Sequence, residues 1–199
     1  MKSIAIVYED DAHEKLIKAL MSFLRIKTVE IDDELCEFHP PLGSKSNFFK
    51  IENDHYRLLK TKADNDVLKK ILFVIDADNS SNDQVYGGLD NSKKKLSELI
   101  EALGIDHISD YFIVYNPDSN IGNTESLLLK TQPEDKRKCI EDFITCSNIK
   151  ANRKSDKKFY QIYGLGCYEE SFYNFDHPHF NELKEKIYNL FDLQQQATA

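Results

Sequence analysis

The length, composition and charge of the sequence indicate one well-cored globular domain. The chain has 199 residues, 41% hydrophobic and 30% charged, with a formal net charge of -8. This acidic balance excludes a protein that coats nucleic acid non-specifically, and no apolar run approaches the roughly 20 residues that span a bilayer. The amino terminus lacks the basic-then-apolar layout of a signal peptide, so we expect a cytoplasmic protein without a membrane partner.

The chain begins with the pattern of a strand, a helix and a second strand. Residues 3–8 are a short apolar run that ends at the acidic residues 9–11. From 12 to 24 the apolar residues recur with the period of a helix, and one of the acids after Glu9 would cap it. Residues 26–31 are predicted to be the second strand.

The next segment, 34–66, is predicted to be an insertion or a hairpin. Its apolar stretches 48–51 and 56–59 are separated by polar residues, as the two strands of a hairpin would be. We expect a single domain over residues 1–193, followed by a flexible polar tail at 194–199.

The central feature of the sequence is an apolar run at 71–75 that lysines precede and acids follow. Such a run is typical of a strand buried on both faces in the middle of a parallel sheet. Asp76 and Asp78 follow at its carboxyl end, which is the end where open α/β sheets bind ligands. Two carboxylates there suit Mg²⁺. The alternative is a solvated loop in which one aspartate caps the next helix.

The alternation of helix and strand continues beyond this run. A helix with its inner face at 96–103 is predicted to end at Gly104. Residues 111–115 are the next buried strand, and a turn-rich loop at 116–123 leads to a short helix with Glu125 in its first turn. We therefore predict an α/β, three-layer fold with a mostly parallel central sheet and helices on both faces.

Three further helices are predicted in the last third of the chain. One begins near Pro133, a short one covers 157–163, and the last covers 180–191 and seals one face of the sheet. His177-Pro178-His179 is interpreted as a helix-entry loop. The helix near Pro133 is expected to turn three apolar residues inward: Ile140, Phe143 and Ile144.

Four acidic residues follow strands or begin a helix in this scheme: Glu9, Asp76, Asp78 and Glu125. The carboxyl ends of adjacent parallel strands gather at one edge of a sheet. Carboxylates there repel one another unless a cation neutralises them, which favours a bound divalent metal. Without metal, removing both aspartate charges should leave the protein no less stable. Chance is the alternative in a chain with 34 acidic residues.

The ordered set of motifs resembles the TOPRIM pattern of primases, topoisomerases and overcoming-lysogenization-defect nucleases. In that pattern a strand ends in Glu, a helix follows, and a later strand ends in Asp-x-Asp. The sequence looks most like small stand-alone TOPRIM-like proteins of bacteria and archaea. The resemblance rests on residues 6–9, 17–20, 74–78 and 116–125.

The resemblance implies a TOPRIM-like, Rossmann-like fold and a site that binds Mg²⁺ or Mn²⁺. It implies these metal ligands: Glu9, Asp76, Asp78 and Glu125. Glu9 would alternatively serve as the general acid or base. Lys157 or Lys158 would neutralise the charge that develops on a phosphoryl group.

Two residues depart from the family pattern. The family has Gly after the first Glu, where this chain has Asp10, and an acid four residues after the Glu, where this chain has His13. Aligning Asp10 and Asp11 with the acidic pair instead would put Val7 or Tyr8 at the position of the Glu. We prefer Glu9, because this keeps the helix in register without a gap.

The leading functional hypothesis is an Mg²⁺-dependent phosphotransfer enzyme, specifically a nuclease that cleaves phosphodiesters of nucleic acid. A basic strip at 150–158 is interpreted as a solvated loop or as a contact for the phosphate backbone. The alternative is a degenerate, inactive TOPRIM module that binds a protein partner or nucleic acid. A nucleotide-binding enzyme is a third hypothesis, without a glycine-rich phosphate loop to support it.

Overall fold

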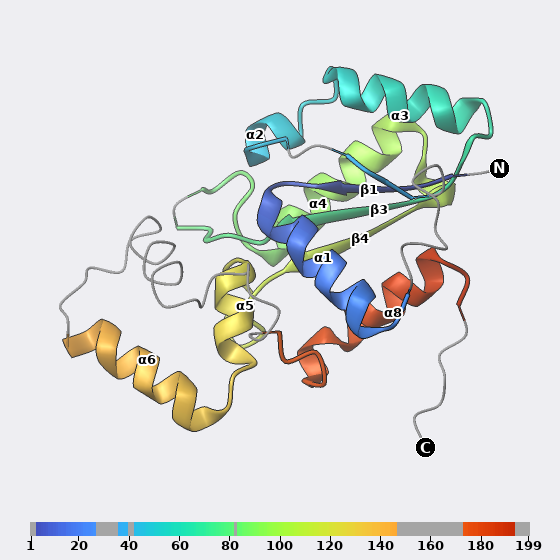
Figure 1. Cartoon of the computed structure of the whole chain (residues 1–199). Helices are drawn as coiled ribbons and strands as arrows, with labels where there is room; N and C mark the ends of the chain where they lie inside the picture. The colour runs from blue at the N-terminus through green and yellow to red at the C-terminus, as the bar shows by residue number, and fades with distance from the viewer. Residues whose placement is uncertain (1–2, 27–35, 40–41, 82, 147–172, 194–199) are drawn as a thin grey trace.

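The four strands of the computed structural model form one parallel sheet in the order β2-β1-β3-β4 (Figure 1). The structure describes residues 3–26, 36–39, 42–81, 83–146 and 173–193. The strands are β1 (Ser3–Tyr8), β2 (Cys36–Phe38), β3 (Leu68–Asp76) and β4 (Ser109–Val114). β3 pairs with β1 on one side and with β4 on the other, so the prediction of a buried strand inside a parallel sheet is confirmed.

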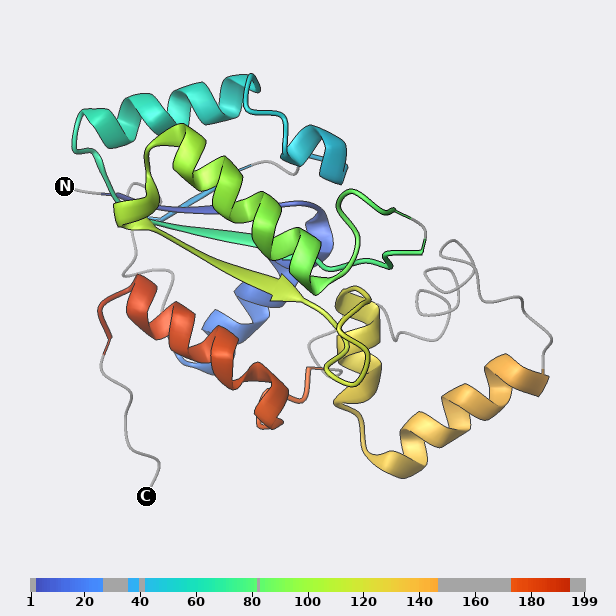
Figure 2. The same cartoon turned by 180° about the vertical axis from the view of Figure 1, so that it is seen from behind.

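Helices cover both faces of the sheet, as predicted (Figures 1 and 2). Successive side chains of a strand point to opposite faces, so Ile6 and Tyr8 of β1 belong to one core and Ala5 and Val7 to the other. The first core is closed mainly by α1 (Asp11–Phe23) and α8 (Asn181–Leu190), and the second by α3 (Asp54–Asp64) and α4 (Leu89–Leu103).

The hairpin predicted within 34–66 is wrong, because 48–51 is the end of a helix and the turn after it, and 56–59 is helical. α2 (Lys45–Phe48) and α3 occupy these positions. The side chains of Ser44 and Asn53 accept hydrogen bonds from the first-turn backbones of α2 and α3, which favours helix starts. In α3, Tyr56 and Leu59 are buried at helical spacing. Short apolar stretches of this kind fit either structure from sequence alone.

The second strand of the described residues is short. β2 covers only three residues, Cys36–Phe38, and pairs with β1 in parallel. Ile26 follows α1 without joining a strand, and the rest of the predicted strand at 26–31 lies outside the described residues.

The other helical elements of the described chain all follow α4. They are η1 (Asp106–Ile108), α5 (Thr124–Lys130), α6 (Glu134–Cys146) and η3 (Pro178–Phe180). α6 extends away from the sheet (Figure 1). Its Ile140 is buried as predicted, but Phe143 is 37% exposed, so its predicted inward position is wrong. The side chain of His177 accepts from the backbone of η3, which confirms the helix-entry loop. The helix predicted at 157–163 lies outside the described residues.

No helix in the described ranges has the length and apolar character to cross a bilayer.

Candidate active and metal-binding site

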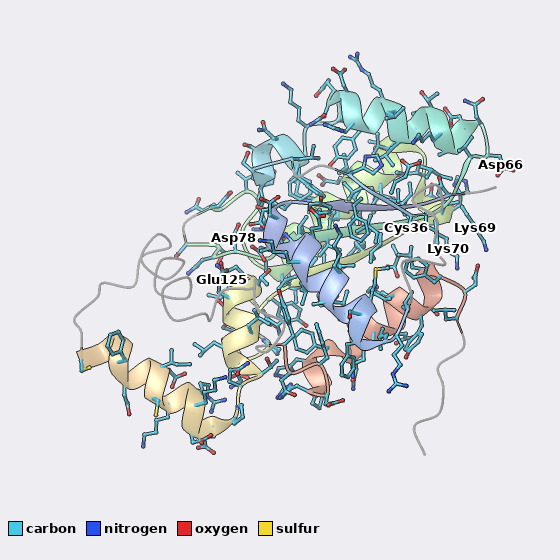
Figure 3. All side chains as sticks on the ribbon, viewed as in Figure 1. Cys36, Asp66, Lys69, Lys70, Asp78 and Glu125 are labelled. Atoms are coloured by element: carbon cyan, nitrogen blue, oxygen red, sulfur yellow. The ribbon has the colours of Figure 1, made fainter. Side chains whose placement is uncertain are left out.

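The carboxyl ends of β1 and β3 and the start of α5 bring the predicted acidic residues to one end of the sheet. Asp78 and Glu125 lie at this end, whereas Lys69 and Lys70 mark the opposite end (Figure 3). Glu9, Asp76 and Glu125 are only 4%, 2% and 6% exposed. Acidic side chains are rarely buried to this degree without partners. We call these three residues together with Asp78 the acidic edge.

Hydrogen bonds link three elements at the acidic edge through Asp76. The backbone N–H of Asp76 donates to Glu9 Oε2 at 3.2 Å. Asp76 Oδ1 accepts from the backbone N–H of Thr124 at 2.9 Å and from its hydroxyl at 3.2 Å. The end of β3 is thereby tied to the end of β1 and to the first turn of α5.

His13 is a fully buried partner of the acidic edge that the sequence analysis identified only as a departure from the family pattern. Its Nε2 lies 3.1 Å from Asp76 Oδ1, and its Nδ1 lies 3.1 Å from Asp10 Oδ1. Burial lowers the pKa of His13, but Asp76 and Asp10 outweigh burial and raise that pKa well above its ordinary value. In its charged form, His13 neutralises part of the acidic edge. In its neutral form, its Nδ1 accepts from the backbone N–H of Asp10 at 3.3 Å.

Glu9 has a high pKa for a carboxyl group. Burial is the largest cause, and the nearby Asp76 adds to it, while His13 opposes both. Together these effects raise the pKa of Glu9 to about 7. The influence of Asp76 and Asp78 on this pKa shows that the carboxylates interact across the acidic edge.

The residues that the two alignments of the first motif place at the Glu position have different surroundings. Glu9 is the residue that lies against β3, whereas Asp10 caps α1 and Asp11 is exposed. Val7 and Tyr8, which the other alignment would place at the Glu position, are core residues. The alignment on Glu9 is therefore the one that the packing supports.

Asp78 has an unusual backbone conformation for a residue other than glycine. Its φ is +58°, in the left-handed region, which costs energy and often marks functional positions. Its N–H donates to the carbonyl of Gly122 at 2.6 Å, and the N–H of Gly122 donates back at 2.9 Å. Gly122 has a φ of +115°, which requires glycine. The loop after β3 is thus joined to the loop that leads to α5.

The first turn of α5 positions Glu125. Asn123 caps the helix, because its side chain accepts from the backbone N–H of Ser126 at 3.1 Å. Glu125 then lies in the first turn, where the helix dipole stabilises a negative charge. The predicted start of this helix is confirmed.

Lys45 is a second buried cation that the sequence analysis missed. It is 5% exposed, and its Nζ lies 3.6 Å from Asp78 Oδ2. Lys45 belongs to the segment interpreted as an insertion, and its contacts are 32 to 47 residues away in the chain. No local pattern in the sequence reveals such contacts.

The chemistry of the acidic edge fits Mg²⁺ or Mn²⁺, with water completing the coordination. Mg²⁺ is commonly held by one or two carboxylates and keeps several waters. Among the described side chains, no three of His, Cys, Asp and Glu converge closely enough to enclose a metal ion by themselves. Asp76 Oδ1 is already engaged by His13 and Thr124. The other carboxylates of the acidic edge are those of Glu9, Asp78 and Glu125. Lys157 and Lys158 lie outside the described residues.

The fold and the acidic edge define a parallel α/β domain with buried carboxylates at the carboxyl ends of its strands. Comparison with solved structures finds the C-terminal region of the Burkholderia pseudomallei OLD protein, with a TM-score of 0.48 and 14% sequence identity. The match covers 86% of this chain and 87% of that chain. A scan against protein-family models and a search of curated proteins both find no match. The functional assignment below therefore rests on the residues of this chain.

Proposed function

We propose that the protein is an Mg²⁺- or Mn²⁺-dependent phosphotransfer enzyme of TOPRIM type, acting as a nuclease on phosphodiesters of nucleic acid. The observation that carries the proposal is the burial of Glu9, Asp76 and Glu125 together with Asp78 at one end of the sheet. Buried carboxylates that repel one another are a costly arrangement, and a divalent cation converts this repulsion into attraction.

Each residue of the acidic edge has a role in this proposal. Asp78 would hold the ion directly, and Glu9 would serve either as a further ligand or as the general acid or base. Glu125 would complete the ligands or the shell of bound water, and Asp76 would contribute through its other oxygen. When bound, the ion polarises a phosphodiester oxygen and lowers the pKa of a water molecule. In the second of these roles, Glu9 would accept or return the proton that moves during the attack on phosphorus. Lys157 or Lys158 neutralises charge on the phosphoryl group.

A cleavage assay with matched variants tests this function. Labelled single-stranded DNA, duplex DNA and RNA are each incubated with the protein in Mg²⁺, in Mn²⁺ and in EDTA. We expect cleavage of at least one substrate that requires the ion, with a loss of about 100-fold or more in Asp78→Asn, because a ligand is removed. Asp66→Asn is the control, since Asp66 also has a left-handed φ, of +56°, and lies at the opposite end of the sheet (Figure 3).

A second candidate function is a degenerate TOPRIM module that binds a protein partner or nucleic acid without cleaving it. The observation in its favour is that His13 and Lys45 already place positive groups next to Asp76 and Asp78. This module would bind labelled nucleic acid or a protein partner equally in Mg²⁺ and in EDTA, and Asp78→Asn would not change its affinity. Binding that does not depend on metal, without any cleavage, would support this binding module and contradict the nuclease proposal.

A further inference from the structure

The segment around α2 contacts both acidic strand ends. The N–H of Gly43 donates to the carbonyl of Glu9 at 3.1 Å. Phe49 stacks on Tyr86 in the loop after β3, with ring centroids 5.1 Å apart and planes 12° from parallel. Both views place α2 beside this loop (Figures 1 and 2). The short helix therefore packs against the acidic edge.

The ammonium group of Lys45 is the main polar link between α2 and this loop. It donates to the carbonyl of Ala77 at 2.8 Å, to the carbonyl of Tyr86 at 3.2 Å and to Ser92 Oγ at 3.2 Å. A lysine ammonium has three N–H donors, and these three acceptors use them all. The acceptors lie at the two ends of the loop and in the first turns of α4, so one side chain ties the whole connection together.

Asp78 lies within the connection that Lys45 holds. Its backbone is paired with Gly122 on one side, and its carboxylate faces the ammonium of Lys45 on the other, at 3.6 Å. A left-handed φ at a residue other than glycine persists only where its surroundings enforce it. Lys45 and Gly122 together provide such surroundings.

We infer that Lys45 is a positioning residue that fixes Asp78 in the orientation needed to bind a divalent ion. The inference rests on the proposed function, because it assigns Lys45 a role in the same metal site. Lys45 acts through Asp78 and through the loop after β3.

The direction in which metal affinity changes when Lys45 is replaced distinguishes a positioning role from a purely electrostatic one. A positive group near a metal site repels a dication, so removing a lysine that acted by charge alone would strengthen metal binding. Removing a residue that orients a ligand weakens metal binding, commonly by about 10- to 100-fold. The two roles therefore predict opposite changes in affinity.

The test measures Mn²⁺ affinity of the whole chain by electron paramagnetic resonance of free Mn²⁺, for wild type, Lys45→Met and Lys186→Met. Lys186 is the matched control, because it is partly buried and pairs with Asp110 at 2.8 Å near the start of β4, away from the acidic edge. We expect Lys45→Met to weaken Mn²⁺ binding about 10- to 100-fold and Lys186→Met to leave it unchanged. Equal or tighter binding by folded Lys45→Met overturns the inference.

Ser92→Ala keeps the test decisive if Lys45→Met does not fold. This substitution keeps the charge of Lys45 but removes one of its acceptors, together with the hydroxyl that donates to the carbonyl of Tyr86 at 3.0 Å, so we expect Mn²⁺ binding to weaken by about two- to fivefold. Unchanged binding in Ser92→Ala overturns the inference in that case.

Hydrogen exchange separates this inference from the proposed function. In metal-free protein, the amide protons of Asp78 and Gly122 should exchange about tenfold faster in Lys45→Met than in wild type, or in Ser92→Ala if Lys45→Met does not fold. In Lys186→Met the two amides should exchange at the wild-type rate. If wild type binds no Mn²⁺, the proposed function fails, and the exchange rates still decide whether Lys45 holds Asp78. Unchanged exchange at both amides contradicts a positioning role.

Discussion

Glu9 and His13 are two buried titratable groups whose proton affinities both lie above their ordinary values. Burial and the charge of Asp76 raise the pKa of Glu9, while Asp76 and Asp10 raise that of His13 against the effect of burial. The two groups consequently contribute to stability over different ranges of pH. Each leads to a prediction that stability measurements can check in EDTA, where metal does not contribute.

The first prediction concerns the charge of Glu9. Its pKa rises from an ordinary 4.5 to about 7 in the folded protein, so folding becomes less favourable as pH increases from 4.5 to 7. Above pH 7 this penalty is fully present, on the order of 1–3 kcal/mol. Glu9→Gln, whose amide oxygen still accepts from Asp76, should therefore be more stable than wild type at pH 8 and nearly equal to it near pH 4.5. Urea unfolding at the two pH values measures the difference, and a less stable variant at pH 8 contradicts the prediction.

The second prediction concerns the imidazole of His13. Because the pKa of His13 is raised, its stabilising contribution is full below the unfolded value near 6.5 and is lost as pH rises through the folded value. His13→Gln should destabilise the protein by about 2–4 kcal/mol at pH 6, since it leaves the carboxylate of Asp76 buried without its cation. The loss should be smaller at pH 9. Equal losses at the two pH values, measured by urea unfolding, would show that His13 contributes packing alone.

The contacts of Asp76 change one expectation drawn from the sequence. Repulsion among carboxylates predicts that metal-free protein tolerates the loss of the aspartate charges. Asp76 Oδ1, however, accepts from Thr124 and lies against His13, so Asp76→Asn weakens an ionic contact as well as relieving repulsion. Asp78→Asn is the cleaner test of metal binding for this reason.

At the scale of helices and strands, local patterns predicted the elements that position most of the acidic edge. The apolar run before Asp76 and the polar start of the helix at Glu125 are signals within a few residues of the site. The helices of 45–64 were mistaken for a hairpin, because short apolar stretches fit both structures. The role of Lys45 was missed, because its partners are distant in the chain. His13 was noted only because it stands where the family pattern has an acidic residue.

The third prediction concerns the start of α5. Asn123→Ala should cost about 1 kcal/mol, because a helix cap is lost, and should also weaken Mn²⁺ binding by loosening the first turn that carries Glu125. Asn53→Ala is the control, since Asn53 caps α3, which packs on the opposite face of the sheet from α5. It should show a similar loss of stability with unchanged Mn²⁺ affinity. Similar metal affinity in both variants would remove Glu125 from the proposed site.

For the molecule as a whole, the parallel sheet determines where the chemistry lies. Two helical layers bury both faces of the sheet, which leaves the ends of the strands as the places where polar groups gather. The sequence predicted this arrangement from its alternation of helices and strands. It did not predict that two buried basic side chains, those of His13 and Lys45, would lie at the acidic edge.

The measurement that tests the metal site most directly is the melting temperature of wild type, Asp78→Asn and Asp66→Asn, each with and without Mn²⁺ or Mg²⁺. An ion that binds only the folded protein stabilises it by about 2.7 kcal/mol at a hundredfold excess over Kd, which corresponds to a rise of about 5–10 °C for a chain of this size. We predict this rise for wild type and Asp66→Asn, and its loss in Asp78→Asn. An identical response of all three proteins to both ions would contradict a metal site at the acidic edge.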